Sequence, residues 1–258
     1  MLKPLDENTG YGLGRRPIFP LDVSNVGFSD GGRQLLDRVS LTLTQGLKTV
    51  IMGANGAGKS LLMRVLHGLV KPEVGAVLWA RVPADAEVMS RQAMVFQKPS
   101  LLRRSAEGNI QFVLGHLNRS EAESRTREIL ERAGLSAVAR TPARLLSGGE
   151  QQRLAVARAL ALEPDILFLD EPCASLDPAS TMAVEEMIET AHQTGTKIVL
   201  VTHDIGQARR LADEVVFMSG GRIAEHTAAR QFFDGPVSAA ARDYLAGRLH
   251  VPGYSAGT

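Results

Sequence analysis

Eight consecutive residues have the composition of a loop that binds phosphate, and they read Gly53-Ala54-Asn55-Gly56-Ala57-Gly58-Lys59-Ser60. Glycines allow the backbone to approach dense negative charge closely and to turn successive N–H groups towards it. The side chain of Lys59 can reach the β- and γ-phosphates of a nucleoside triphosphate, and the hydroxyl of Ser60 can bind Mg²⁺. We therefore expect these residues to bind a triphosphate together with its magnesium ion.

The segments on either side of this loop have the patterns that a phosphate-binding loop requires. Residues 48–52 form a short apolar run that suits a buried strand, and apolar residues recur at helical spacing over residues 61–67. A helix that begins behind Gly58 points the positive end of its dipole at the loop. The alternative is a glycine-rich turn that contains a lysine by chance, and the order of strand, loop and helix argues against it.

Four polar residues end apolar runs that read as strands: Gln97, Asp170, Glu171 and His203. Because ligands of open α/β sheets lie at the carboxyl ends of the strands, we expect these side chains to converge on the loop. Asp170 can bind Mg²⁺, and Glu171 can orient or deprotonate the attacking water. His203 can hydrogen-bond the γ-phosphate or the water, and the amide of Gln97 can contact Mg²⁺ or water. Each also has a structural alternative, as a strand end or, for His203, a helix cap.

The bulk properties of the chain are those of a globular protein. It has 258 residues, of which 44% are hydrophobic, and its formal net charge of +1 argues against a large basic surface for nucleic acid. Its one cysteine, Cys173, suits a reducing compartment. No apolar run approaches the roughly 20 residues of a membrane-spanning helix, and the polar N-terminus does not resemble a signal peptide. We expect a cytoplasmic protein.

Strand-like and helical segments alternate along most of the chain, which predicts an α/β fold with a mainly parallel sheet. The strand patterns before the phosphate loop predict antiparallel strands attached to the edge of this core. Residues 98–145 are rich in arginine and lack strand patterns, so we expect an inserted α-helical sub-domain there. Within it, Ser120 and Glu123 have the spacing of a capping box, which predicts a helix start.

The composition also suggests three segments. Residues 1–19 carry glycines and prolines without periodicity, and we expect a loosely ordered N-terminal arm. Residues 20–235 hold the predicted core with its helical insertion. Residues 236–258 form a C-terminal tail, with a helical pattern at about residues 239–249.

A last motif lies directly before a helical pattern, at residues 146–152, and reads Leu-Ser-Gly-Gly-Glu-Gln-Gln. With this motif the chain resembles the ATP-binding cassette (ABC) family, the nucleotide-binding subunits of ABC transporters. The resemblance runs from about residue 21 to about residue 233. In family order it includes Walker A (53–60), the Q-loop Gln97, the signature motif (146–152), Walker B (166–170), the catalytic Glu171, the D-loop (175–177) and the switch His203.

The resemblance implies a P-loop NTPase that binds ATP and Mg²⁺ and hydrolyses ATP. Ser147, Gly148 and Gly149 lie at a predicted helix N-terminus, which is a second anion site. The resemblance implies that they contact the ATP of another protomer in a head-to-tail homodimer, and that Asp177, in the D-loop, belongs to the nucleotide-binding residues. ATP would close this dimer, and hydrolysis would reopen it.

The resemblance also implies partners and a location. The partners are integral-membrane permease subunits and, indirectly, a periplasmic or extracellular substrate-binding protein, with no nucleic acid. The location is the cytoplasmic face of the inner (plasma) membrane, as a peripheral subunit.

Two positions depart from the family pattern. The family usually stacks adenine on an aromatic residue just before a Gly-x-Arg-like segment, but here Asp30 precedes Gly31, and the nearest aromatic residue is Phe28. Adenine stacking and core packing are both open for Phe28. Cys173 stands where the family commonly has threonine, and its position beside the site predicts inhibition by thiol reagents.

The segment from residue 202 to residue 213 resembles the subgroup that serves oxyanion importers, as do residues 222–226 and the following Phe232-Phe233. We favour tungstate as the cargo, with phosphate or molybdate next. The alternatives are the motor of an amino-acid importer or of an exporter, and a soluble ABC ATPase without a transport role.

Overall fold

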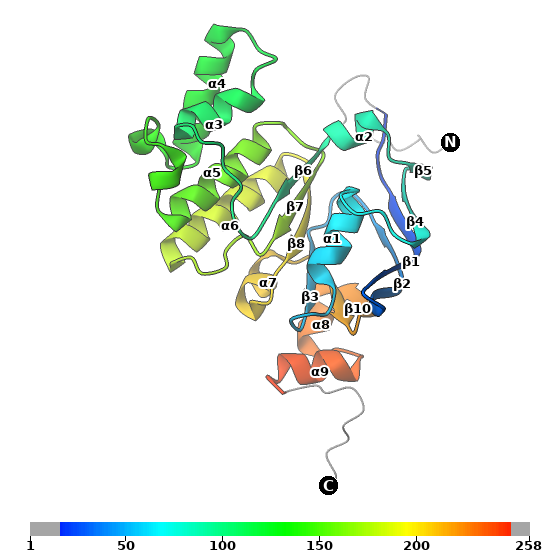
Figure 1. Ribbon diagram of the computed structural model, residues 1–258. Helices are drawn as coiled ribbons and strands as arrows, with labels where there is room; N and C mark the ends of the chain where they lie inside the picture. The colour runs from blue at the N-terminus through cyan, green and yellow to red at the C-terminus, as the bar shows by residue number, and fades with distance from the viewer. Residues whose placement is uncertain (1–15, 249–258) are drawn as a thin grey trace, which may run out of the picture.

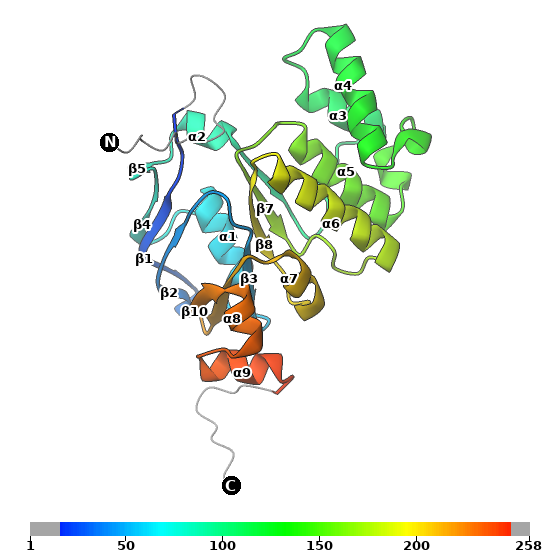
Figure 2. The same cartoon turned by 180° about the vertical axis from the view of Figure 1, so that it is seen from behind.

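The structure is a computed structural model of the 258-residue chain, and it describes residues 16–248. Fifteen of the predicted arm residues, 1–15, and the last ten residues, 249–258, lie outside this range. The described part alternates strands and helices around two sheets (Figures 1 and 2). Among residues 16–248, no helix has both the length and the apolar character that crossing a membrane requires.

The larger sheet has six strands and confirms the predicted, mainly parallel core. Its order is β10-β9-β3-β8-β7-β6, and only the β9–β10 pair is antiparallel. The central strands are buried along their whole length, which explains their continuous apolar sequences. The strands are β3 (Thr49–Gly53), β6 (Gln92–Val95), β7 (Ile166–Asp170), β8 (Lys197–Val201), β9 (Glu214–Ser219) and β10 (Arg222–Ala228).

The opening strands are antiparallel, as predicted, but they form a sheet of their own instead of extending the edge of the parallel sheet. The order of this second sheet is β2-β1-β4-β5. One backbone hydrogen bond that joins the two sheets runs from the N–H of Asp37 to the carbonyl of Gly221, at 2.9 Å. The strands are β1 (Leu21–Asp30), β2 (Arg33–Leu43), β4 (Val74–Trp79) and β5 (Val82–Pro83).

Helices cover both faces of the parallel sheet. Because successive side chains of a strand point to opposite faces, Ile51 and Phe168 pack against α1, whereas Met52 and Leu167 lie in a second cluster with α5 and α6. α1 and α5 therefore lie on opposite faces, as Figures 1 and 2 also show. The helices are α1 (Lys59–His67), α2 (Ala86–Ser90), α5 (Gly148–Leu160), α6 (Pro178–Gln193), α7 (Ile205–Leu211), α8 (Ala229–Asp234) and α9 (Ala239–Leu245).

The region predicted as a helical insertion contains α3 (Ala106–Val113), α4 (Arg119–Arg132) and two short 3₁₀ turns, Ser136–Val138 and Ala143–Leu145. Apolar side chains from this region and from α5 form a third buried cluster, which includes Ile110, Leu130 and Leu154. The predicted capping box at Ser120 is wrong. Asn118 caps α4 instead, and its side chain accepts a hydrogen bond from the N–H of Glu121 at 3.0 Å.

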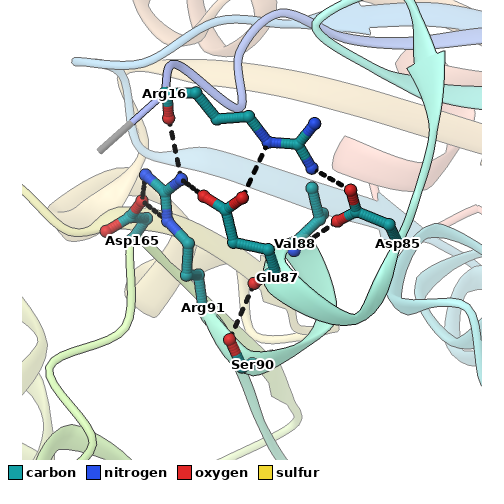
Figure 3. A network of polar contacts seen from close by, with 7 residues as sticks. All are labelled: Arg16, Asp85, Glu87, Val88, Ser90, Arg91 and Asp165. Carbon is teal, nitrogen blue, oxygen red and sulfur yellow. Dashed lines mark hydrogen bonds and ion pairs between the residues drawn. The ribbon is translucent and has the colours of Figure 1, made fainter. Parts of the chain in front are cut away.

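Residues 16–19, the last four of the predicted arm, make defined contacts: Ile18 is fully buried, although Arg16 and Pro17 are exposed. Figure 3 shows Arg16 paired with Asp85 and Glu87 of the α2 segment, and its carbonyl accepting a hydrogen bond from Arg91 at 2.7 Å. Arg91 is also paired with Asp165, which immediately precedes β7. This network joins the start of the described chain to the amino ends of β6 and β7, at the edge opposite to their polar carboxyl ends.

Candidate active site

The loop of residues 53–60 connects β3 to α1, as the sequence predicts. Gly58 precedes the helix with a left-handed φ of 97°. Gly53 has a φ of 144°, and a Cβ added there would lie 2.2 Å from the carbonyl oxygen of Met218, so this position requires glycine. The ammonium of Lys59 lies inside the loop and donates to the carbonyls of Gly53 at 2.8 Å and Ala54 at 3.0 Å. The lysine is therefore already oriented along the loop that would surround a phosphate.

Ser60 and Asp170 come together beneath this loop. The hydroxyl of Ser60 donates to a carboxylate oxygen of Asp170 at 2.8 Å, although the two residues are 110 positions apart in the chain. Asp170 is only 4% exposed, and burial raises the pKa of its carboxyl against the opposing effect of the Ser60 hydrogen bond. Burial also shifts the pKa of Lys59, in this case downwards, and the negative charges of Glu171 and Asp170 oppose that shift. A hydroxyl beside a buried carboxylate is an oxygen donor set that suits a hard divalent cation.

The carboxylate of Glu171 is contacted from both sides by predicted site residues. Gln97 donates to one oxygen at 3.1 Å, and Nδ1 of His203 lies 3.0 Å from the other. These residues follow β6, β7 and β8, so three neighbouring parallel strands bring them to one edge. Glu171 also has a left-handed φ of 48°, which is uncommon for a residue other than glycine. The structure thus brings Gln97, Asp170, Glu171 and His203 together with the phosphate loop.

The signature residues are not among those that surround Glu171, and they lie instead at the start of α5. Ser147 caps α5 in a reciprocal capping box with Glu150, and the helix begins at Gly148, so the signature motif overlaps the first turn of the helix. Its N-terminus packs beside the N-terminus of α6, which Asp177 caps by accepting a hydrogen bond from the N–H of Ser180. A Cβ added to Gly149 would lie 2.1 Å from the hydroxyl oxygen of Ser180 on α6. Within one chain, the signature and D-loop residues are therefore neighbours.

The two departures from the family pattern have local explanations in the fold. Phe28 lies in β1 opposite Leu36 and packs, partly buried, against the core on the α1 side of the sheet. This contact supports the packing alternative, and adenine stacking stays a prediction. Cys173 is half-buried, and burial raises the pKa of its thiol to about 11. A thiol with this pKa contains little thiolate at neutral pH, which argues against ready inhibition by thiol reagents.

Three residues near the site are absent from the sequence-based predictions. Asn109 of α3 is fully buried and hydrogen-bonds both the N–H and the carbonyl of Leu102, while Arg158 of α5 donates to the carbonyl of Ser100 at 2.5 Å. These contacts fix the segment that follows Gln97 to the helical region. At the other end of the chain, the hydroxyl of Tyr244 donates to the backbone carbonyl of His203 at 3.1 Å. The contacts of Arg158 and Tyr244 have no local sequence signal, because their partners are 58 and 41 residues away in the chain.

Comparisons with known proteins agree with this geometry. Residues 36–174 match the protein family described as ABC transporter. The chain is 38% identical over 208 residues to the tungstate uptake system ATP-binding protein TupC of Peptoclostridium acidaminophilum, covering 80% of this chain and 97% of the relative. It is 34% identical over 250 residues to a phosphate import ATP-binding protein, PstB of Mycoplasmoides gallisepticum (90% and 77%). It is 37% identical over 235 residues to a methionine import ATP-binding protein, MetN of Caulobacter vibrioides (87% and 70%).

Comparison with solved structures also finds ATP-binding subunits of this family. The chain superimposes on cbiO1 of Clostridium perfringens, described as part of the ABC transporter complex cbiONQ, with a TM-score of 0.75 and 29% identity, covering 84% of this chain and 91% of the other. It also resembles the ATP-binding cassette MJ0796, a dimer in a post-hydrolysis state bound to ADP and Pi, with a TM-score of 0.73 and 28% identity (81% and 99%). The family match, these relatives and the convergence of the predicted motifs lead to one conclusion: the chain belongs to the ATP-binding cassette family and is an ABC transporter ATPase.

Proposed function

We propose that this chain is the motor subunit of an ABC importer, in which Glu171 orients and activates the water that attacks the γ-phosphate of ATP. The observation that carries the proposal is the position of the Glu171 carboxylate between Gln97 and His203. A carboxylate oriented from both sides at the end of a strand suits the role of a general base. Hydrolysis then breaks the bond between the γ-phosphorus and its bridging oxygen, and ADP and phosphate are released.

The phosphate loop supplies the binding part of this mechanism. Its backbone N–H groups and the ammonium of Lys59 would bind the β- and γ-phosphates, since Lys59 already lies against the loop carbonyls. Ser60 and Asp170, together with Gln97, are the residues that would bind Mg²⁺. When bound, Mg²⁺ would neutralise negative charge on the phosphates.

The location of the signature motif supports a head-to-tail homodimer. Ser147, Gly148 and Gly149 begin a 13-residue helix, whose N-terminus favours an anion. This helix lies on the face of the sheet opposite to α1, which carries the phosphate loop. The two phosphate-binding parts of one chain are thus suited to two different nucleotides. We propose that the signature residues and Asp177 complete the site of a second copy of this chain.

The segment after Gln97 offers a route from the nucleotide to a membrane permease. Gln97 contacts Glu171, and the following residues are fixed to α3 and α5 through Asn109 and Arg158. A change in the position of Gln97 on ATP binding or hydrolysis would therefore be transmitted to the helical region. We propose that permease subunits dock beside this segment, on the cytoplasmic face of the membrane, and receive cargo from a separate substrate-binding protein.

We further propose an oxyanion as the cargo, with tungstate favoured and phosphate or molybdate next. The tungstate and phosphate import relatives support this choice, together with the oxyanion-subgroup resemblance of residues 202–213 and 222–226. The methionine import relative has similar identity, so an amino acid is the competing cargo. The cargo does not contact the ATPase subunit in this scheme, and a cellular measurement must identify it.

The substitution Glu171→Gln tests the catalytic part of the proposal. Glutamine has nearly the same shape but cannot accept a proton at neutral pH, so the variant should bind ATP, hydrolyse it at least about 100-fold more slowly and accumulate the closed dimer. Steady-state ATPase assays, ATP binding and size-exclusion chromatography with ATP measure these three properties. Wild-type hydrolysis by this variant would remove Glu171 from the mechanism.

Deletion of the gene tests the cargo. Intracellular tungsten, molybdenum and phosphorus are measured by mass spectrometry at trace external supply, beside uptake of labelled methionine. A selective fall in one element, restored by the wild-type protein but not by Glu171→Gln, identifies that cargo and links it to hydrolysis. A fall in methionine uptake alone would replace the oxyanion with an amino acid.

A further inference from the structure

The residue proposed to orient Glu171 lies in a very short connection. Thr202, His203 and Asp204 join β8 to α7, and the side chain of Asp204 caps α7 by accepting a hydrogen bond from the N–H of Gln207 at 3.0 Å. The hydroxyl of Thr202 accepts a hydrogen bond from the N–H of Asp204 at 3.0 Å. The residues on either side of His203 are therefore fixed locally, whereas the imidazole itself is 57% exposed.

The backbone carbonyl of His203 is contacted by the C-terminal helix. The hydroxyl of Tyr244, on α9, donates to this carbonyl at 3.1 Å. The ring of Tyr244 packs on Phe217 of β9 with a distance of 5.3 Å between ring centroids, so the sheet determines where the hydroxyl lies. Burial raises the pKa of Tyr244, and the negative charges of Glu171 and Asp204 raise it further. The phenol is therefore protonated and able to donate at neutral pH.

α9 is itself firmly attached to the core. The carboxylate of Glu225, on β10, accepts hydrogen bonds from the N–H groups of Val237 and Ser238 at 3.1 and 2.9 Å. The hydroxyl of Ser238 caps the helix through the N–H of Ala241, which is fully buried. Figure 1 shows α8 and α9 together at the end of the molecule where the described chain stops. The described part of the region that the sequence suggests as a separate tail thus contacts the candidate active site through Tyr244.

We infer that Tyr244 is a positioning residue for ATP hydrolysis, which fixes the His203 backbone so that the imidazole stays on the carboxylate of Glu171. The inference rests on the proposed roles of His203 and Glu171. A bond to the backbone carbonyl restricts the rotation of the peptide that carries the imidazole, without occupying the imidazole itself. Because Tyr244 does not contact the phosphate loop, its hydroxyl should affect the hydrolytic step and not the binding of ATP.

The test uses the full-length chain with Tyr244→Phe, which removes the hydroxyl and keeps the ring on Phe217. The turnover number kcat should fall about two- to tenfold, the ratio that corresponds to the loss of one neutral hydrogen bond, while KM for ATP stays unchanged. Arg242→Ala is the matched control, because Arg242 donates to the carbonyls of Pro236 and Val237 on the same segment. This control should keep the wild-type kcat.

The substitution His203→Ala separates this inference from the proposed function on which it rests. In the His203→Ala background, adding Tyr244→Phe should cause no further fall in kcat, since the imidazole that Tyr244 positions is gone. Equal falls in both backgrounds would indicate a general structural effect and overturn the inference. A wild-type kcat for Tyr244→Phe, beside a reduced kcat for His203→Ala, would overturn the inference and leave the proposed function standing. A wild-type kcat for His203→Ala would reject both.

A second variant covers the case in which Tyr244→Phe weakens the fold. Incorporation of 4-aminophenylalanine at position 244 keeps the ring and replaces the hydroxyl with an N–H donor. This variant should restore most of the lost kcat if the hydrogen bond is the cause. Failure to restore it in a protein with the wild-type melting temperature would contradict the inference.

Discussion

Replacing Gly149 with alanine tests how closely α5 and α6 pack at the signature motif. The added Cβ would lie 2.1 Å from the Oγ and 2.8 Å from the Cβ of Ser180, both closer than van der Waals contact allows. Ser180 cannot move freely, because its hydroxyl donates to Asp177 at 2.7 Å and accepts from Arg153 at 3.4 Å. The neighbouring Gly148 is the matched control, since a Cβ added there meets no atom within 4 Å.

The size of the effect follows from comparing these two variants. Both Gly148→Ala and Gly149→Ala gain up to about 1 kcal/mol of helix propensity. Only Gly149→Ala also suffers overpacking, which typically costs about 1–3 kcal/mol. The free energy of unfolding should therefore be about 1–3 kcal/mol lower for Gly149→Ala than for Gly148→Ala. For a chain of this size, each kcal/mol corresponds to a shift of about 2–4 °C in the melting temperature.

Thermal and urea unfolding are measured without nucleotide, so that the proposed contacts of both glycines with ATP do not contribute. The substitution Ser180→Gly removes the atoms that the new methyl group would meet. In that background Gly149→Ala should no longer destabilise the protein. Equal melting temperatures for Gly148→Ala and Gly149→Ala would refute the close packing of the two helix N-termini.

Three further predictions concern binding, pH and reactivity. Ser147→Arg should leave ATP binding by the monomer intact but block the ATP-dependent dimer in size-exclusion chromatography; a normal dimer would contradict the composite site. For Glu214, burial would raise the pKa, but His226, Thr49 and Lys197 lower it to about 2, from an ordinary value of 4.5. Its charged form should therefore add up to about 3 kcal/mol of stability above pH 4.5, which is lost as the pH falls towards 2, and urea unfolding of Glu214→Gln should show this advantage of the wild type shrinking over that range. Alkylation of Cys173 by iodoacetamide at pH 7.5, followed by mass spectrometry, should be much slower than that of free cysteine, and rapid labelling would contradict the raised thiol pKa.

The phosphate loop and the polar residues at the strand ends could be predicted from the sequence, because short stretches of neighbouring residues determine them. The strand, loop and helix around Lys59 follow from short-range patterns, and the polar residues that end β6, β7 and β8 converge because parallel strands share one edge. The cap of α4 was not predicted correctly, because Asn118 and Ser120 are both good capping residues and the sequence does not rank them.

Contacts between distant segments could not be predicted in this way. Tyr244 is 41 residues from His203, and its role depends on how α9 packs on β9 and β10. The separation of the opening strands into their own sheet likewise depends on which strands pair, since antiparallel patterns alone do not specify the neighbours. The close approach of Gly149 to Ser180 results from the packing of two helices, and glycine in a motif gives no indication of that distance.

The location of α1 and α5 on opposite faces of one sheet bears on how the activity depends on the amount of protein. In the proposed head-to-tail arrangement no single chain can complete a site, so hydrolysis by the free subunit would follow mass action and rise more steeply than linearly with its concentration. Two subunits attached to one permease would instead experience an effective concentration in the millimolar range, as for partners joined by a short linker. The membrane partner would then raise ATPase activity by keeping two copies near each other. Unassembled subunits would hydrolyse little ATP once diluted.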